Sequence, residues 1–262
     1  MSWTPGGEVT AIDSAGFGPI TITQSVTITS PNGVEAGIVP TAGGDAVTIS
    51  PTAKATITLR GLTLGGSGVG QNGIVYNAKA GGALNIIGCV VKDFTGDGIM
   101  LTPNFQAIEG TFVSIADSSI LNNAGNGIEI NPQSSLTNIV FAIDRTSLED
   151  NGAANLSTAG ILVNTAASGP IIGTISSSQA ASNGSALSLI GTGAGANVRV
   201  RNSVFILSTV AADAHLNASN GTVYLYSNQI DYLNNAQGTA YSDGNNNIGI
   251  ATGNALTSHA RQ

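Results

Sequence analysis

Acidic side chains gather between residues 93 and 150 of this 262-residue chain, together with one arginine. The group considered for chemistry consists of Asp93, Asp97, Asp117, Asp144, Arg145, Glu149 and Asp150. Carboxylates bind hard cations such as Ca²⁺ and serve as general acids and bases. This segment therefore holds the candidate residues for metal binding or catalysis.

Which of these side chains meet depends on a repeat in the sequence. By its register, Asp117 and Arg145 occupy equivalent places on adjacent units, as do Asp93 and Asp150 with Asn122 between them. This places the charges on one flank of the molecule. The alternative is that Asp117 and Arg145 form a surface ion pair worth at most about 1 kcal/mol, with the other acids in solvated turns. We favour that alternative.

Three tyrosines form a second candidate site. Tyr224, Tyr226 and Tyr232 lie close together near the C-terminus. Their rings could stack on sugars or could instead cover the end of a hydrophobic core. The histidines, His215 and His259, adjoin no acidic cluster, so a hydrolase site of paired acids with a nearby histidine is incomplete.

The repeat is a run of six residues with an apolar residue at each end. It begins at Leu59, Ile86, Ile115, Ile143, Ile175, Val200 and Leu225. Such a period, of about 20 to 50 residues, is typical of solenoids, in which each unit buries its inner face only against its neighbours. A second apolar segment follows in several units, as in NGIVY from Asn72 and NGIEI from Asn126. At least two strands per turn are indicated, with aliphatic side chains stacked in columns.

Asparagines recur in the predicted turns, at Asn123, Asn151, Asn183 and Asn234 or Asn235. Stacked asparagines can hydrogen-bond from coil to coil, and asparagine tolerates a left-handed backbone. Gly, Asn, Ser, Thr and Val, which are poor helix formers, dominate the sequence, and no window shows a 3.6-residue period. The sequence predicts an all-β parallel solenoid.

One continuous domain is predicted over residues 1–262, with repeats from about 9 to 248 and a polar tail over 254–262, because no linker-like break interrupts the repeats. The N-terminal third alternates cleanly, as in ITITQSVTITS from Ile20. No amphipathic helix precedes it. An uncapped end exposes strand edges, so we expect self-association through that end or a partner that covers it.

Charged residues make up only 9% of the chain, and the net charge is −7. The basic residues are scattered and form no stripe that could neutralise a phosphate backbone, so no nucleic-acid partner is expected. A mildly acidic surface is compatible with neutral or cationic ligands. No apolar run approaches the roughly 20 residues of a membrane helix, so no membrane insertion is expected.

The single cysteine, Cys89, excludes an intrachain disulfide and is expected to be buried and inert. The start MSWTPGGEVT lacks the features of a secretory signal. The sequence itself leaves the compartment open.

The motifs GGEVTAIDSAGFGPITITQSVTITSPNGVEAGI, TLRGLTLGG, NGIVY and YSDGNNNI resemble the bacterial right-handed parallel β-helix repeat proteins of the pectate-lyase-like superfamily. The resemblance covers about residues 6 to 250. It implies a right-handed single-stranded parallel β-helix of about nine or ten coils, and it implies secretion or a cell-surface location if a leader precedes the chain. That superfamily contains polysaccharide lyases and glycoside hydrolases beside proteins without assigned activity.

A site like that of a pectate lyase would need three or four carboxylates around Ca²⁺ and an arginine or lysine to take the proton α to a uronate carboxylate. The catalytic candidates under this resemblance are Asp117, Asp144, Arg145 and Asp150, and the metal candidates are Asp93, Asp117 and Asp150.

The favoured interpretation is a non-enzymatic β-helix that acts as a scaffold or binding surface, with polysaccharide as the expected ligand and no cofactor. The alternative is a Ca²⁺-dependent polysaccharide lyase or a glycoside hydrolase acting on acidic polysaccharide. Converging acids in a groove would favour the enzyme, and acids spread along solvated turns would favour the scaffold.

Overall fold

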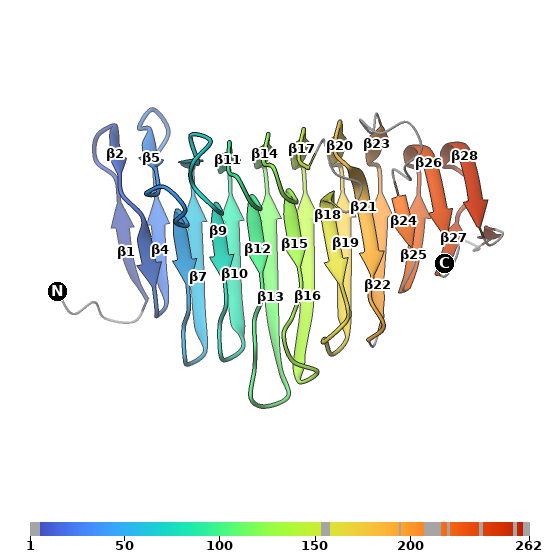
Figure 1. Cartoon of the computed structure of the whole chain (residues 1–262), viewed down its shortest axis with the longest axis horizontal. Helices are drawn as coiled ribbons and strands as arrows, with labels where there is room; N and C mark the ends of the chain where they lie inside the picture. Colours follow the sequence, from blue (N-terminus) through green and yellow to red (C-terminus); the bar gives the residue numbers. More distant parts are fainter. Residues whose placement is uncertain are drawn as a thin grey trace.

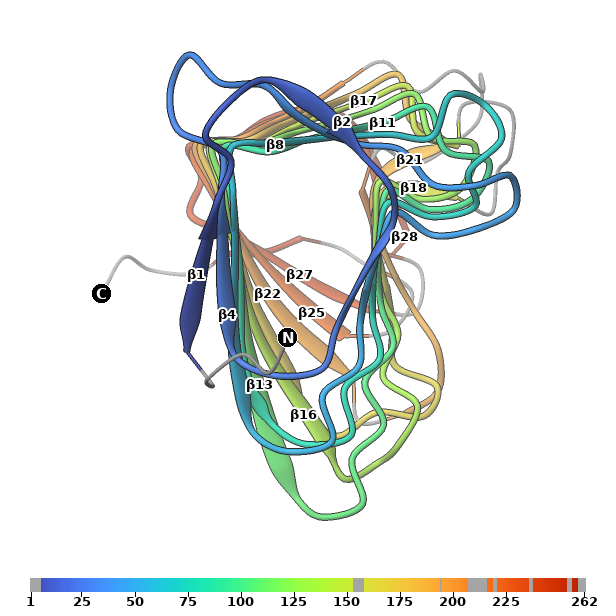
Figure 2. The same ribbon diagram turned by 90° about the vertical axis from the view of Figure 1, so that its left-hand side faces the viewer.

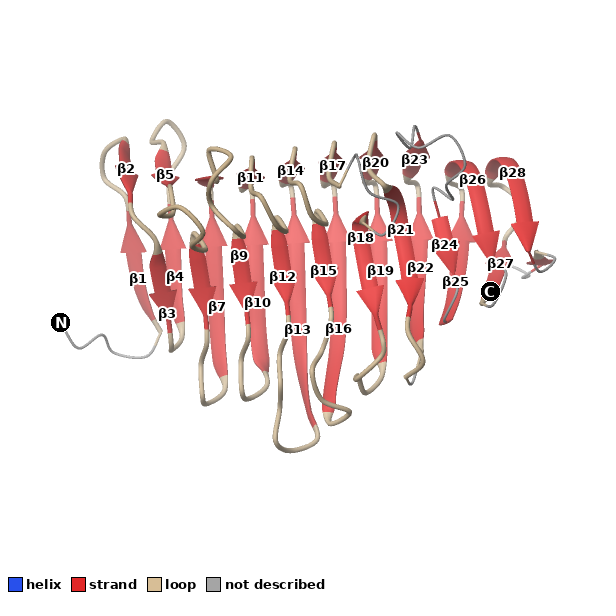
Figure 3. Cartoon of the chain, viewed as in Figure 1, coloured by secondary structure: helices blue, strands red, loops and turns tan. Residues whose placement is uncertain are grey.

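The chain winds into a long stack of flattened coils, and short strands of neighbouring coils pair in parallel along the whole stack (Figure 1). The computed structural model describes residues 6–152, 158–193, 195–206, 216–218, 221–235, 238–253 and 256–258. These residues contain strands, turns and loops but no helix (Figure 3). Consequently, no helix among them could span a membrane.

Three faces run along the stack. Face 1 consists of β1 (Gly7–Thr10), β4 (Val26–Thr29), β7 (Ala55–Arg60), β10 (Gly82–Ile87), β13 (Glu109–Ala116), β16 (Thr137–Asp144), β19 (Ile171–Ser176), β22 (Ala196–Arg201), β25 (Gly221–Tyr226), β27 (Thr239–Ser242) and β29 (Thr257–Ser258). Face 2 consists of β2 (Ala15–Phe17), β5 (Ala36–Ile38), β8 (Leu62–Gly65), β11 (Val90–Lys92), β14 (Ser119–Leu121), β17 (Ser147–Glu149), β20 (Gln179–Ala181) and β23 (Val204–Ile206).

Face 3 consists of β3 (Ile20–Ile22), β6 (Val47–Ile49), β9 (Ile74–Tyr76), β12 (Ile99–Leu101), β15 (Ile128–Ile130), β18 (Ala159–Asn164), β21 (Ser185–Ile190) and β24 (Leu216–Ala218). At the C-terminal end, β26 (Gln229–Asn235) and β28 (Asn247–Gly253) each continue from face 2 into face 3. The predicted two or more strands per turn are therefore three in most coils.

The predicted repeat matches the observed register. All seven first residues of the repeat fall in one column of face 1, and the second segments align on face 3 from Ile74 to Ile161. These side chains point inward and form one continuous hydrophobic core. The stack is held together because each coil covers the core residues of its neighbours.

The handedness follows from the view along the stack (Figure 2). Starting from the N-terminal end, the chain runs up face 1, across face 2 and down face 3 while it recedes, which is a right-handed turn. The parallel β-helix is confirmed, but the coil count differs slightly from the predicted nine or ten. Among the described residues, face 1 receives eleven strands.

The two ends differ from the interior coils. In the first coil Val9 and Ile20 are only partly buried, and Ile12 is 88% exposed, since no described residue covers them on the N-terminal side. Self-association there remains a prediction. At the other end β29 pairs with β27, so ordered strand continues into the predicted polar tail, whose residues 254–255 and 259–262 lie outside the described part.

Large and small side chains complement each other between coils inside face 1. Gly173 lies opposite Phe141, and a Cβ atom on Gly173 would fall 2.0 Å from the Phe141 ring. We expect Gly173→Ala to lower the free energy of unfolding by about 1–3 kcal/mol, because the buried ring has to move. Urea denaturation would measure this loss. The double variant Gly173→Ala, Phe141→Leu should recover part of it, and equal stabilities of the single and double variants would contradict this account.

Candidate functional site

A column of left-handed residues marks the corner where face 2 ends. Asp93, Asn122 and Asp150 directly follow β11, β14 and β17, and their φ angles are 62°, 51° and 55°. Their backbone amides donate to carbonyl groups of the next coil. Aspartate and asparagine are among the non-glycine residues that adopt this conformation most readily. Their equivalent positions agree with the predicted register.

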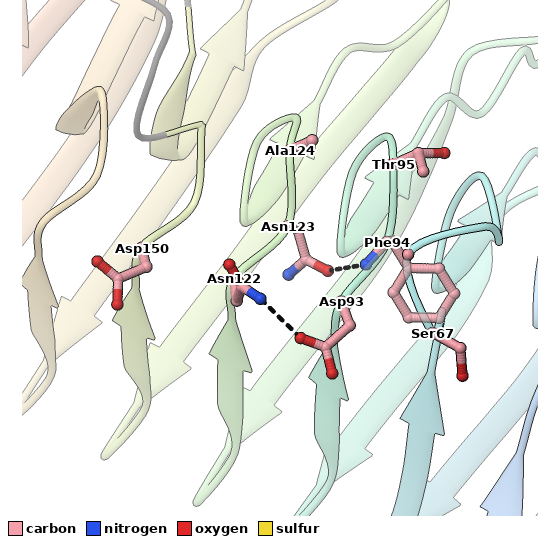
Figure 4. A pocket seen from close by; sticks show the side chains of 9 residues that line it. Ser67, Asp93, Phe94, Thr95, Asn122, Asn123, Ala124 and Asp150 are labelled. Atoms are coloured by element: carbon pink, nitrogen blue, oxygen red, sulfur yellow. Dashed lines mark hydrogen bonds between the residues drawn. The ribbon is translucent and has the colours of Figure 1, made fainter.

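A shallow groove of about 530 Å³ follows this column (Figure 4). It is lined by Ser67, Gly68, Asp93, Phe94, Thr95, Asn122, Asn123, Ala124 and Asp150. The Asn122 side-chain amide donates to Asp93 at 2.7 Å, and Lys92 Nζ lies 3.7 Å from the other Asp93 oxygen. Within the described residues, Asp150 makes no ion pair. The groove therefore carries a net negative charge, while Phe94, Ala124 and Gly68 make much of its lining apolar.

Buried asparagines fix the wall of this groove. Asn151 Nδ2 donates to Asn183 Oδ1 at 3.0 Å, and Asn123 Nδ2 donates to Asn151 Oδ1 at 2.8 Å. Asn123 Oδ1 in turn accepts the backbone amide of Phe94, whose ring is buried. The predicted ladder is confirmed at these three asparagines, while the side chains of Asn234 and Asn235 lie outside the described part. The groove residues therefore project from turns with satisfied backbone groups.

The other acidic candidates lie at a different corner, between faces 1 and 2. Arg145 donates to both Asp117 oxygens at 2.7 and 3.0 Å and also contacts Asp144, which accepts from Ser176. The Asp117 and Arg145 side chains are about half exposed. The hydrogen bond from Arg145 lowers the pKa of Asp117, and Asp117 raises the pKa of Arg145. This is the surface ion pair that the favoured interpretation predicted.

The structure thus separates the candidates that the sequence placed on one flank. Three-residue strands such as β14 stand between the Asp117 corner and the groove corner. The proposed metal set of Asp93, Asp117 and Asp150 is divided between these corners. No group of three or more His, Cys, Asp or Glu side chains in the described residues is arranged to hold a metal ion.

The three candidate tyrosines lie on two different strands. Tyr224 and Tyr226 lie on β25 of face 1, whereas Tyr232 lies on β26, and its side chain is outside the described part. The Tyr224 ring stacks on Tyr241, with centroids 5.1 Å apart, and the Arg199 guanidinium lies 5.6 Å from its centroid. Both faces of the Tyr224 ring are therefore occupied, and a sugar would have to contact its edge or hydroxyl group.

Sequence reasoning missed the partner of one buried acid. Asp97 precedes β12 and is 8% exposed; its Oδ1 accepts the backbone amide of Asn126 at 2.6 Å. Burial, followed by a hydrogen bond and charge repulsion from Glu129, raises its pKa to about 7. Glu129 lies on β15, one coil further along. Only the register of face 3 could have indicated this pair.

His215 lies outside the described residues, as does His259. Cys89 is buried, as predicted, and burial raises the pKa of its thiol.

Comparison with known proteins relates the chain to a solved structure by its fold. No protein-family model matches the chain, and no curated protein matches it. Among solved structures, the chain is similar to a crystal structure of pectate lyase Pel9A, with a TM-score of 0.46 and 13% identity over 91% of this chain. The chain spans 57% of the length of that structure. The likeness is one of fold alone.

Proposed function

We propose that this protein is a non-enzymatic polysaccharide-binding β-helix whose corner groove receives a glycan chain lying along the axis of the stack. One observation carries the proposal: Asp93, Asn122 and Asp150 project into one groove from equivalent turns of successive coils. Adjacent coils are about 4.8 Å apart, so the groove repeats its hydrogen-bonding groups at a regular interval. A polymer with regularly spaced hydroxyl groups suits such a surface.

The charge of the groove indicates which glycans it accepts. Of its carboxylates, Asp93 lies near Lys92, Asp150 makes no ion pair within the described residues, and the whole chain carries a net charge of −7. An anionic polysaccharide would be repelled, whereas neutral or amino-sugar chains would not. Binding of acidic polysaccharide through Ca²⁺ is not supported, because the candidate ligands lie at two different corners.

A glycoside hydrolase is the second candidate, and one spacing favours it. Asp93 and Asp150 are separated by two coils, or about 9.6 Å, which is just above the roughly 6.5–9.5 Å that separates the two carboxyl groups of inverting enzymes. Release of reducing ends from a neutral polysaccharide by the native chain, lost in Asp150→Asn, would establish hydrolysis. Binding without release would leave the non-enzymatic proposal standing.

Asp150→Asn and Asp150→Ala test the groove directly. We expect Asp150→Ala to weaken binding of a neutral or amino-sugar polysaccharide at least about tenfold, the loss of one strong hydrogen-bonding group. Affinity electrophoresis and titration calorimetry on a polysaccharide panel would measure it. Asn202→Ala is the matched control, because Asn202 has a similar φ of 49° at the other corner. Equal binding by the native chain and both Asp150 variants would remove the groove as the site.

A further inference from the structure

We infer that face 1 is an interface through which two copies of this chain associate, sheet against sheet. An apolar row crosses the middle of this face on three adjacent strands. Phe112, Val140 and Ile172 are neighbours in register on β13, β16 and β19, and they are 43%, 44% and 43% exposed. Contiguous exposed apolar side chains on an otherwise polar surface mark interaction sites.

The surroundings of this row are small and uncharged. The next outward positions on the same strands are Ser114, Ala142 and Thr174. Two charged residues border these positions: Arg199, which pairs with Thr174 on the next strand, and Asp144, which contacts Arg145 and Ser176. Because the positions on β13, β16 and β19 themselves carry no long charged side chain, a second sheet can approach closely there.

The occupant that fits is a second copy, because the row is nearly symmetrical about Val140. In register it reads Thr56, Ala83, Phe112, Val140, Ile172, Asn197 and Thr222. A two-fold axis between the copies and parallel to β16 reverses the strand order. Val140 then faces its own equivalent, and Phe112 faces Ile172 of the second copy. This self-complementarity is what an isologous interface requires.

The charges of the face are compatible with the same arrangement. Under this two-fold axis Arg199 faces Asn85, since these residues share a column two strands on either side of β16. Arg60 faces Tyr226 three strands out on either side, where a guanidinium can lie over an aromatic ring. No arginine of face 1 faces another arginine. Asp144, on β16 itself, faces its own equivalent, and Arg145 contacts the Asp144 carboxylate in each copy.

The available area is sufficient for a specific but modest interface. Seven strands from β7 to β25, about 4.8 Å apart and about 20 Å long, present on the order of 670 Å² per copy. Two copies would bury about 1,300 Å², at the lower end of the range for stable complexes. We therefore expect association at micromolar rather than nanomolar concentration.

Sedimentation equilibrium of the full chain tests the interface over about 1 µM to 1 mM, the range of weak dissociation constants. We expect a monomer–dimer equilibrium, with Val140→Lys raising the dissociation constant at least about tenfold, because two lysines would meet at the axis. Leu121→Lys is the matched control: Leu121 is a partly exposed apolar residue on β14, on face 2. Circular dichroism would show that both variants keep the fold.

Cross-linking gives an independent readout of geometry. The variant Val140→Cys should form a covalent dimer with a short bismaleimide, and Leu121→Cys should not, while native Cys89 is buried and unreactive. A monomer at every concentration would overturn the inference. So would a dimer that Val140→Lys leaves intact, since the copies would then meet elsewhere, for example at the N-terminal coil. Loss of polysaccharide binding in Val140→Lys without any dimer would assign the face to glycan instead.

Discussion

Replacement of Asn151 by alanine should lower the free energy of unfolding by about 3–5 kcal/mol, the largest loss we expect from a single polar side chain. Asn151 is fully buried; its Nδ2 donates to Ile120 O and Asn183 Oδ1, and its Oδ1 accepts from Asn123. The substitution removes four hydrogen bonds of the buried Asn151 side chain at once, each worth about 0.5–1.5 kcal/mol and more where a buried group is left unpaired. Coils on both sides lose bonds at once.

Chemical denaturation followed by circular dichroism would measure this effect. The control is Asn197→Ala, which removes an exposed asparagine from β22 and should change stability by less than about 0.5 kcal/mol. If Asn151→Ala cost less than about 1 kcal/mol, water would be replacing the lost bonds, and the ladder would not be a main source of stability.

The second large effect is a gain of stability from Asp97→Asn at pH 8. The pKa of Asp97 rises from 3.8 to about 7 on folding, first because of burial and then because of Glu129. Between these values the unfolded chain has released the proton while the folded chain retains it. The stabilisation by this group is therefore complete below about pH 4 and lost as the pH rises towards 7.

Asparagine removes this titration without removing the hydrogen bonds. Its Oδ1 can accept the Asn126 amide, as Asn72 Oδ1 accepts the Asp97 amide one coil earlier at 2.9 Å. Its amide group can donate to Glu129, where two carboxyl groups now meet. One pKa unit corresponds to about 1.4 kcal/mol, and since Glu129 shares in the titration, we expect a gain on the order of 2 kcal/mol at pH 8.

Unfolding curves of both proteins at pH 4.5 and pH 8 would measure the gain. The difference in stability between Asp97→Asn and the native chain should be large at pH 8 and small at pH 4.5. A difference that does not change with pH would show that Asp97 is already ionised in the folded chain, contrary to this account.

The sequence was most informative where one coil repeats another. The column from Leu59 to Leu225 is aliphatic because each member packs on the next, so periodicity alone predicted the register of face 1. Asn123, Asn151 and Asn183 were predictable for the same reason. The left-handed backbone, however, was expected at these ladder asparagines and is found one residue earlier, at Asn122, Asp150 and Ser182.

The sequence could not show that residues close together in the chain lie at different corners of a coil. Face 2 strands such as β14 are only three residues long and resemble turns, so Asp117 and Asn122 were placed on one flank although a whole face lies between them. The pairs Asp97 with Glu129 and Tyr224 with Tyr241 involve different repeat positions or the irregular last coils. Such contacts depend on side-chain direction and on where a loop folds back, which periodicity does not encode.

The left-handed corner between faces 1 and 2 has a consequence for how this molecule can change. Successive coils place Gly88, Asp117, Arg145, Ser177 and Asn202 there, all with φ between 45° and 61°. The backbone conformation is thus kept while the side chain varies from none to a guanidinium. The corner positions of successive coils lie about 4.8 Å apart, and each accepts a different polar side chain. Substitutions at these positions can therefore change the surface one coil at a time, while the core residues that specify the fold are unchanged.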